Sequence, residues 1–277
     1  MLNLLTLISK EVRDCYRNWW VGTAIVVMTA MALVLSLLGS APVGTTSISP
    51  LTVTTVSLSS LSVFFIPLIA LLLSYNSVVG EEERGTLLLL LTYPVPRSLI
   101  VLGKFIGQLI ILTAAILIGY GVAALTITLQ AEAAFLDQNW LVFGKLIFSS
   151  ILLGAVFLGL GIFISTLMKE SATAAAWAIG VWLIFVVLFD MALLGVLSSN
   201  MSAYLPDAIV KWVMLANPAD AYRMFNLATS EDTALLSGMA GLRSDQVVSP
   251  TMTLSVLATW ILFPVLAFCF AFQRRRT

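Results

Sequence analysis

The chain has 277 residues, of which 60% are hydrophobic and 10% are charged, with 14 basic and 14 acidic side chains. A soluble domain carries about 25% charged residues, so this composition excludes a soluble fold and indicates an integral membrane protein. The sequence contains no histidine, which excludes zinc-dependent intramembrane proteases and serine proteases with a Ser/His pair. The basic residues are scattered in short runs, so nucleic acid is not an expected partner.

The N-terminal segment has the pattern of an amphipathic helix. Apolar residues between Leu4 and Trp19 recur at helical spacing, and Lys10, Arg13 and Asp14 fall on the other side. This pattern predicts a helix at the membrane surface. Its role is either a plain anchor on the inner leaflet or an elbow that couples a cytoplasmic partner to the first span.

Long apolar stretches predict the transmembrane helices. A spanning helix needs about 20 mostly apolar residues. Six stretches meet this requirement, at residues 19–39, 58–79, 105–130, 143–168, 172–197 and 251–273. We therefore expect an all-α integral membrane protein in which residues 1–277 form a single domain with six transmembrane helices.

Lys and Arg residues are distributed unequally between alternate loops. One set of segments holds ten of them: Lys10, Arg13, Arg17, Arg84, Arg97, Lys104, Lys169, Arg274, Arg275 and Arg276. The other set holds four: Lys145, Lys211, Arg223 and Arg243. Because basic residues accumulate in cytoplasmic loops, we expect both termini to be cytoplasmic.

The segment between the second and third spans, GEEERGTLLLLLTYPVPRSLIVLGK (residues 80–104), has a pattern of its own. Three glutamates at 81–83 suit the start of a helix, residues 86–91 are apolar, and Pro94 and Pro96 end the helix. Five consecutive leucines outside a full span need a bilayer interface or a protein groove to bury them. This segment either only stabilises the fold or docks into a partner protein.

Small residues recur on one face of the fourth span: Ser150, Gly154, Gly161 and Ser165. Such a seam lets another helix approach closely. The approaching helix belongs either to a second copy or to the same chain. The pair Gly103-x-x-x-Gly107 is a weaker pattern of the same kind, because a lysine lies inside it.

Asp190 lies within the fifth predicted span. An aspartate at the centre of a membrane helix costs roughly 2.5 to 3.5 kcal/mol on insertion scales, so its side chain is expected to face protein or water. It is either a polar point or proton site in a translocation path, or the buried partner of a Ser, Thr or Trp on a neighbouring span.

Residues 198–250 form the longest external loop, in which 204–215 and 221–228 show amphipathic spacing on either side of Asn217 and Pro218. We expect two short surface helices that form a platform for an external protein, with packing on the membrane surface as the alternative. The candidate contact residues are Trp212, Asn217, Pro218, Asp220, Tyr222, Arg223 and Phe225. Methionines in the loop are too widely spaced for a metal chelate, so no metal site is expected.

The chain carries no P-loop. Gly103-Lys104 and Gly144-Lys145 lack the upstream glycine and the hydroxyl residue of that motif. We therefore expect no cofactor in this chain, and any ATP must bind to another subunit.

Segment 80–104 resembles the signature of permease subunits in the ABC-2 family: a Glu-rich entry, Gly-Thr, a leucine run, Thr-x-Pro, an arginine and Gly-Lys. The basic amphipathic N-terminus, the six spans and the long external loop extend the resemblance over essentially the whole chain. It implies a non-catalytic subunit of the bacterial inner membrane, present as two copies, whose coupling helix docks into a separate cytoplasmic ATPase that holds ATP and Mg²⁺. The candidate coupling residues are Glu81, Glu82, Glu83, Arg84, Gly85, Thr86, Leu89, Pro94, Arg97 and Lys104.

Two other functions remain open from the sequence. One is a proton-coupled secondary transporter that uses Asp190, which would need no ATPase. The other is a membrane scaffold that moves no cargo and uses ATP-driven motion to open or load a periplasmic partner.

Overall fold

In the computed structural model, residues 4–16, 19–38, 50–92, 95–130, 140–198, 207–227 and 249–274 are described, and their regular structure is entirely helical. The helices are α1 (Leu4–Tyr16), α2 (Trp19–Leu38), α3 (Pro50–Ser74), α4 (Val79–Glu83), α5 (Thr86–Leu91), α6 (Arg97–Gln130), α7 (Trp140–Leu167), α8 (Ser171–Trp182), the π-helix η2 (Leu183–Leu188), α9 (Phe189–Ser198), α10 (Asp207–Leu215), α11 (Pro218–Leu227) and α13 (Pro250–Arg274). The predicted all-α fold is confirmed for this part of the chain.

Within the described residues, five helices are long and apolar enough to cross a membrane: Thr54–Glu83, Arg97–Leu129, Trp140–Leu167, Ser171–Val196 and Pro250–Phe272. They correspond to five of the six predicted spans. The first predicted span, residues 19–39, corresponds to α2, in which Ile25–Leu37 is a shorter apolar helix. The fifth span is interrupted by η2, where the helix widens between α8 and α9.

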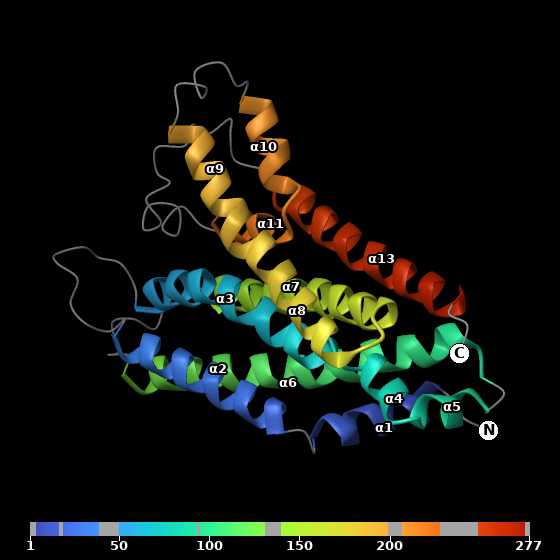
Figure 1. Cartoon of the computed structure of the whole chain (residues 1–277). Helices are drawn as coiled ribbons and strands as arrows, with labels where there is room; N and C mark the ends of the chain where they lie inside the picture. Colours follow the sequence, from blue (N-terminus) through green and yellow to red (C-terminus); the bar gives the residue numbers. More distant parts are fainter. Residues whose placement is uncertain are drawn as a thin grey trace.

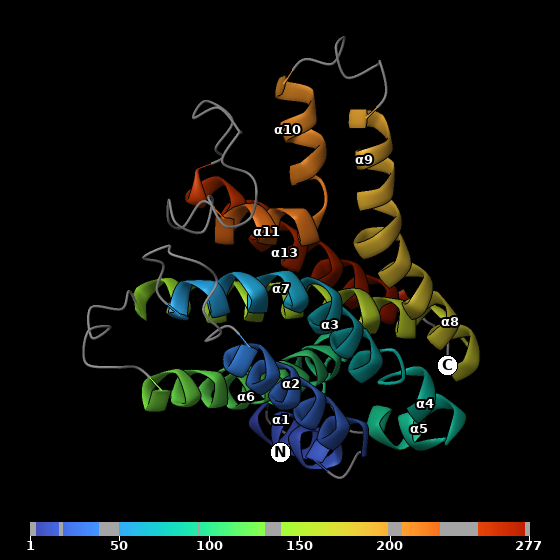
Figure 2. The ribbon, with the colours of Figure 1, turned by 90° about the vertical axis from the view of Figure 1, so that its left-hand side faces the viewer.

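The helices form stacked layers with α7 at the centre (Figure 1). Helices α1 and α2 pack along α6, while α3 and α13 pack along α7, and α6 and α7 contact each other. Helices α1, α4 and α5 lie at one end of the bundle together with the last turns of α13, and we call this the α4 end (Figure 1). The opposite end, which holds the start of α3 and the end of α6, is called the far end. Helix α9 rises away from the bundle beside α10 (Figure 2).

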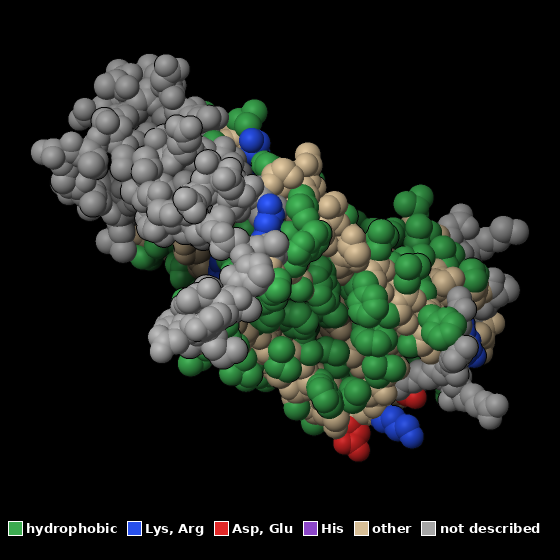
Figure 3. Space-filling view, turned by 90° about the horizontal axis from the view of Figure 1, so that it is seen from above, with side chains coloured by type: hydrophobic (Ala, Val, Ile, Leu, Met, Phe, Trp, Pro, Cys, Tyr) green, Lys and Arg blue, Asp and Glu red, His purple; other side chains and the backbone are tan. Residues whose placement is uncertain are grey.

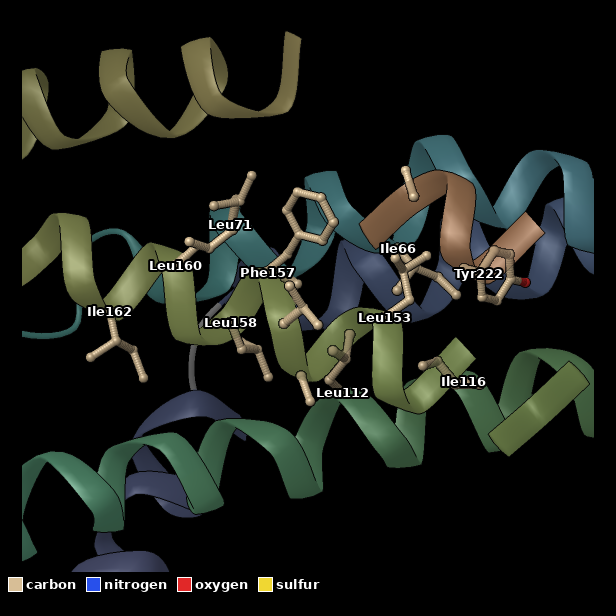
Figure 4. Close-up of a cluster of buried hydrophobic side chains, with 14 of the residues drawn as sticks. Ile66, Leu71, Leu112, Ile116, Leu153, Phe157, Leu158, Leu160, Ile162 and Tyr222 are labelled. Atoms are coloured by element: carbon tan, nitrogen blue, oxygen red, sulfur yellow. The ribbon is translucent and has the colours of Figure 1, made fainter. Parts of the chain in front are cut away.

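The core is built around the apolar side chains of α7. Leu153 and Phe157 of α7 lie between Ile66 of α3 and Leu112 of α6, and all four are buried (Figure 4). Tyr222 of α11 reaches the same cluster from the far end. Lipid tails are as apolar as leucine, so close van der Waals packing of these side chains holds α7 against α3 and α6.

The small residues of the fourth span pack against helices of the same chain. A Cβ atom at Gly154 would lie 2.5 Å from Leu112 Cδ2 of α6, and one at Gly161 would lie 1.9 Å from Ser74 Oγ of α3. Ser165 Oγ accepts hydrogen bonds from the backbone of residues 78 and 79. Of the two alternatives for this seam, the structure therefore supports contact within the chain.

Two helices begin several residues earlier than the sequence predicts: α3 at Pro50 in place of 58, and α6 at Arg97 in place of 105. Residues 50–57, which are rich in Ser and Thr and precede the predicted second span at 58–79, form the first turns of α3. Leu51 and Thr54 are buried there, and the Thr55 hydroxyl donates to the Leu51 carbonyl. Tertiary packing thus outweighs the low helix propensity of these residues.

The exterior has the character of a membrane protein. Seen from above, green hydrophobic side chains outnumber the charged ones on the coloured part of the face (Figure 3). The span formed by α8, η2 and α9 is the least buried of the five, with large apolar side chains such as Trp177, Ile184 and Leu194 exposed. These surfaces require lipid or another protein chain around them.

Candidate functional site

The α4–α5 segment (residues 79–92) is two short helices instead of the single helix predicted. They meet at Gly85, whose φ of +71° lies in the left-handed region. Glycine adopts this conformation without the steric cost that a Cβ atom brings. The Thr86 hydroxyl donates to the carbonyl of Glu81 across the break, at 3.1 Å. The glycine therefore lets α5 turn away from α4 while one hydrogen bond keeps the two together.

Glu81 belongs to a buried charged cluster, which we define as Lys10, Glu11, Glu81, Lys104 and Gln108. Lys104 Nζ lies 2.9 Å from Glu81 Oε1 and 3.3 Å from Glu11 Oε2. Lys10 Nζ donates to Glu81 at 2.9 Å, and Gln108 donates to Glu11 at 3.2 Å. Lys104 is only 4% exposed and the two glutamates are each 7% exposed. Charges buried this deeply are tolerated only when they are paired, so the cluster joins α1, α4 and α6.

Two further polar contacts hold α4. Ser165 Oγ, near the end of α7, accepts from the Val78 and Val79 backbone N–H groups at 3.0 and 3.1 Å. The Glu83 carboxylate accepts from the backbone N–H of Ser171, at 2.6 Å, and from its hydroxyl. Because Ser171 is the first residue of α8, Glu83 satisfies a backbone donor at the start of the fifth span. The short helix α4 thus contacts α1 and α6, α7, and α8.

The outer face of α5 is apolar and exposed. Leu88 and Leu89 are 60% and 66% exposed, whereas Leu87 points inward and is buried. Arg84 and Thr86 are exposed beside them. Two adjacent leucines with a charged neighbour, outside the bundle core, form a surface that a protein groove could cover.

The ten candidate coupling residues therefore have different surroundings. Glu81 and Lys104 are buried in the charged cluster, and Glu83 is bound to Ser171. Glu82 and Arg97 are partly exposed. Exposed on the surface are Arg84, Gly85, Thr86 and Leu89. Pro94 lies outside the described residues.

Sequence reasoning missed Glu11, the partner of Lys104. A signal for it exists, because Glu11 follows Leu4 and Leu7 at helical spacing on the face of α1 that packs against α6. A second signal is the pair Gly103 and Gly107 on either side of Lys104. A Cβ atom at either glycine would lie under 3.0 Å from α1, against Leu7 and Glu11 respectively. Gly103 and Gly107 thus form the surface of α6 on which α1 packs. Lys104, which lies between them in sequence, forms an ion pair with Glu11 of α1.

Asp190 lies in a second cluster nearer the far end. Arg223 of α11 donates to Asp190 and also to Asp220, the latter at 3.0 Å. Its guanidinium carbon lies 5.8 Å from the centre of the Phe64 ring. Asn217 donates to the carbonyl of Phe185 within η2, at 2.8 Å. The partner of Asp190 is therefore an arginine of α11, in place of the Ser, Thr or Trp that the sequence suggested.

The two short helices predicted in residues 198–250 are present, as α10 and α11. The prediction that both lie on the surface is wrong for α11, which is buried. The Tyr222 hydroxyl contacts Ser150 at 3.1 Å, and Ser150 in turn contacts Tyr120. Of the seven candidate residues for an external contact, five are buried: Asn217, Pro218, Asp220, Tyr222 and Phe225. Arg223 is partly exposed, and Trp212 of α10 is exposed. Within the described residues, Trp212 is the candidate with a free face for an external protein.

The carboxylates of Asp190 and Asp220 share the guanidinium of Arg223. The stability of this cluster therefore depends on pH. Burial, and next the negative charge of Asp190, raise the pKa of Asp220 to about 7, although Arg223 and Asn217 act in the opposite direction. Since this value lies above the ordinary 3.8, the folded chain binds the proton more tightly than the unfolded chain does. The resulting stabilisation is complete below the ordinary value and is lost as the pH rises through about 7.

We therefore expect the thermal unfolding midpoint in detergent to fall as the pH is raised from about 5 to about 8, and Asp220→Asn to flatten this dependence. The amide cannot lose a proton and keeps the size of the carboxyl group. Glu170→Gln, at an exposed carboxylate of the α4 end, serves as the control and should keep the wild-type slope. An Asp220→Asn chain with the same slope as the wild type would contradict the assignment.

The arrangement defines a multi-pass helical membrane protein with an exposed apolar helix fixed to several spans at one end. The family model described as "ABC-2 family transporter protein" matches residues 5–276. The chain therefore belongs to the ABC-2 family of transporter proteins. It is a permease subunit, the non-catalytic membrane component of an ABC transporter, and such a permease works with an ATPase partner.

Two curated relatives match nearly the whole chain. The "Probable ABC transporter permease protein NosY" of Stutzerimonas stutzeri is 39% identical over 277 residues, covering 100% of both chains. The protein of the same name from Pseudomonas aeruginosa is 42% identical over 258 residues, covering 92% of each. The alignment with the first of these includes the α4–α5 segment and both clusters.

Proposed function

We propose that this chain couples ATP hydrolysis by a separate cytoplasmic ATPase, similar to NosF, to export or to mechanical transmission to a periplasmic protein similar to NosD. The process served is the maturation of the copper sites of nitrous oxide reductase. Support comes from the two relatives named NosY, at 39% and 42% identity. ATP and Mg²⁺ bind to the ATPase in this proposal, since the chain lacks a P-loop.

In this proposal two copies of the chain lie in the bacterial inner membrane with six spans each and with both termini and the α4 end in the cytoplasm. The distribution of Lys and Arg between alternate loops favours this orientation. Helix α2 has 20 residues, which at 1.5 Å per residue is about 30 Å, the thickness of the hydrocarbon core. This length supports the proposal that α2 also spans the membrane, which brings the number of spans to the six predicted.

The observation that carries the docking proposal is the exposed face of α5. Leu88 and Leu89 project from a helix whose neighbour α4 is tied to α1, α6, α7 and α8. Movement of a protein bound to this face would therefore be transmitted through α4 to α1, α6, α7 and α8. The nearby Arg84 and Glu82 provide charged groups for the rim of an apolar groove.

Docking is tested with Leu89→Asp. A carboxylate placed in an apolar groove loses its hydration without gaining a partner, so we expect the ATPase to be lost from the purified complex. Stimulation of its ATP hydrolysis should be lost as well. The measurements are co-elution through gel filtration in mild detergent and the ATPase rate after reconstitution.

Leu129→Asp is the matched control, because Leu129 is another exposed leucine, on α6 at the far end. It should retain the ATPase. Both variants are first checked for membrane insertion and a normal gel-filtration profile. Retention of a fully stimulated ATPase by Leu89→Asp would remove α5 as the docking helix.

A further inference from the structure

We propose that Glu81 is a positioning residue that connects the α4–α5 segment to a rigid body formed by α1 and the first turns of α6. Movement of a docked ATPase would enter the bundle through this connection. The inference rests on the proposed docking at α5 and adds the route by which the movement reaches the spans.

Helices α1 and α6 are packed too closely to slide past each other. A Cβ atom at Gly103 would lie 2.9 Å from Leu7 Cβ, and one at Gly107 would lie 2.7 Å from Glu11 Cβ. The Lys104 ammonium, between the two glycines in sequence, lies 3.3 Å from Glu11. Close contact through small residues, combined with a buried ion pair, holds two helices in one register. We therefore treat α1 and the start of α6 as a single body.

Glu81 attaches α4 to this body from the other side. Its Oε1 atom lies 2.9 Å from both Lys104 and Lys10. Separating Glu81 from Lys104 would leave each of these two buried charges with one partner in place of two, Lys10 for Glu81 and Glu11 for Lys104, which is unfavourable. If α4 instead moves together with α1 and α6, the ion pair between Glu81 and Lys104 stays intact. Burial is thus the physical reason why a displacement of α4 is passed on to α1 and α6.

The cluster also contains buried oxygens that are not satisfied. Glu81 Oε2 and Gln108 Oε1 have no hydrogen-bond donor among the described residues. Buried acceptors without a donor are uncommon, so the carboxylate of Glu81 is held through its other oxygen, Oε1, by Lys104 and Lys10.

The test separates ATPase binding from ATPase stimulation with Glu81→Gln. This variant keeps the shape of the side chain and leaves the exposed face of α5 unchanged, and Lys104 retains Glu11 as a partner. We expect the dissociation constant for the ATPase to remain within about twofold of wild type, while maximal stimulation falls about tenfold, within the usual range for coupling between sites. Both are measured with the full-length chain in nanodiscs, titrated with the ATPase that co-purifies with it.

Asp14→Asn is the matched control. Asp14 also lies near Lys10, at 3.8 Å, but its side chain is 57% exposed, so water can replace the lost contact. It should change neither quantity. Normal stimulation by Glu81→Gln would overturn the connection, and so would a parallel loss of binding and stimulation, because Glu81 would then be a docking residue. Failure of the wild-type chain to bind the ATPase would instead remove the proposed function itself.

A disulfide gives a second test, which remains informative if Glu81→Gln does not fold. Leu7→Cys with Gly103→Cys, in a background with Cys15→Ser and Cys269→Ser, places two thiols across the contact of α1 and α6. The two Cβ atoms would start 2.9 Å apart, so a shift of about 1 Å is needed to reach disulfide geometry, and the reduced form of the same variant is therefore the reference. A disulfide holds its two Cβ atoms at a nearly constant separation. If α1 and α6 move as one body, this restraint changes nothing in the movement, and oxidation should leave ATPase stimulation within about twofold of the reduced sample. Loss of stimulation on oxidation, restored by reduction, would show that α1 moves along α6 and would overturn the proposal.

Discussion

Replacing Lys104 with methionine is expected to destabilise the folded chain by about 3–5 kcal/mol, the cost of removing one partner from a buried ion pair. Lys104 is held 2.9 Å from Glu81 and 3.3 Å from Glu11 in a site that leaves it 4% exposed. Methionine fills most of the space but leaves two carboxylates without their shared cation. The measurement is the midpoint of thermal unfolding in detergent, with the yield of monodisperse protein as a second readout.

Lys10→Met is the matched control because Lys10 lies at the same distance, 2.9 Å, from the same oxygen of Glu81. Its side chain is 43% exposed, so solvent screens the pair and the expected cost is only about 0–1 kcal/mol. Both variants remove a cation that lies 2.9 Å from Glu81. They differ in burial, both of the lysine and of its second carboxylate, which is the buried Glu11 for Lys104 and the exposed Asp14 for Lys10. Equal losses of stability would contradict the view that burial, and not the ion pair as such, determines the effect.

The sequence was sufficient for the helices because their signals are local. Apolar runs of membrane length predicted the spans to within a few residues at most ends, and amphipathic spacing predicted α1, α10 and α11. The glutamates and leucines of residues 81–91 marked the segment that lies at the junction of four helices. Its break was less visible, although Gly85 is the residue type that a left-handed conformation favours.

The sequence could not predict which distant side chains meet. Glu11 and Lys104 are 93 positions apart, and no local pattern states that α1 lies on α6. The same limit applies to Arg223 and Asp190, which join α11 to the fifth span. Amphipathic spacing in α11 fits a surface helix and an inserted helix equally well, because both present one apolar face. Only tertiary packing distinguishes them, and it buries Tyr222 fully.

Gly161→Leu is expected to destabilise the chain by about 3 kcal/mol, at the upper end of the usual cost of overpacking a core. Gly161 is the position where α7 approaches α3 most closely among the glycines of the described residues. A Cβ atom at this position would lie 1.9 Å from Ser74 Oγ, 3.0 Å from Ser74 Cβ and 3.5 Å from the Leu71 backbone. The Ser74 hydroxyl can rotate, but its Cβ atom and the backbone cannot. A leucine therefore forces α3 and α7 apart.

Gly121→Leu supplies the comparison that isolates this packing effect. Gly121 lies within α6, is exposed, and has nothing within 4 Å of an added Cβ atom. Since leucine is favoured over glycine in a helix by several tenths of a kcal/mol or more, this variant should be neutral or slightly more stable than the wild type. Unfolding midpoints of the two variants in the same detergent give the difference directly. If Gly161→Leu were as stable as Gly121→Leu, α3 and α7 would not be in close contact at this point, and the anchoring of α4 by Ser165, one turn further along the same face of α7, would lose its geometric basis.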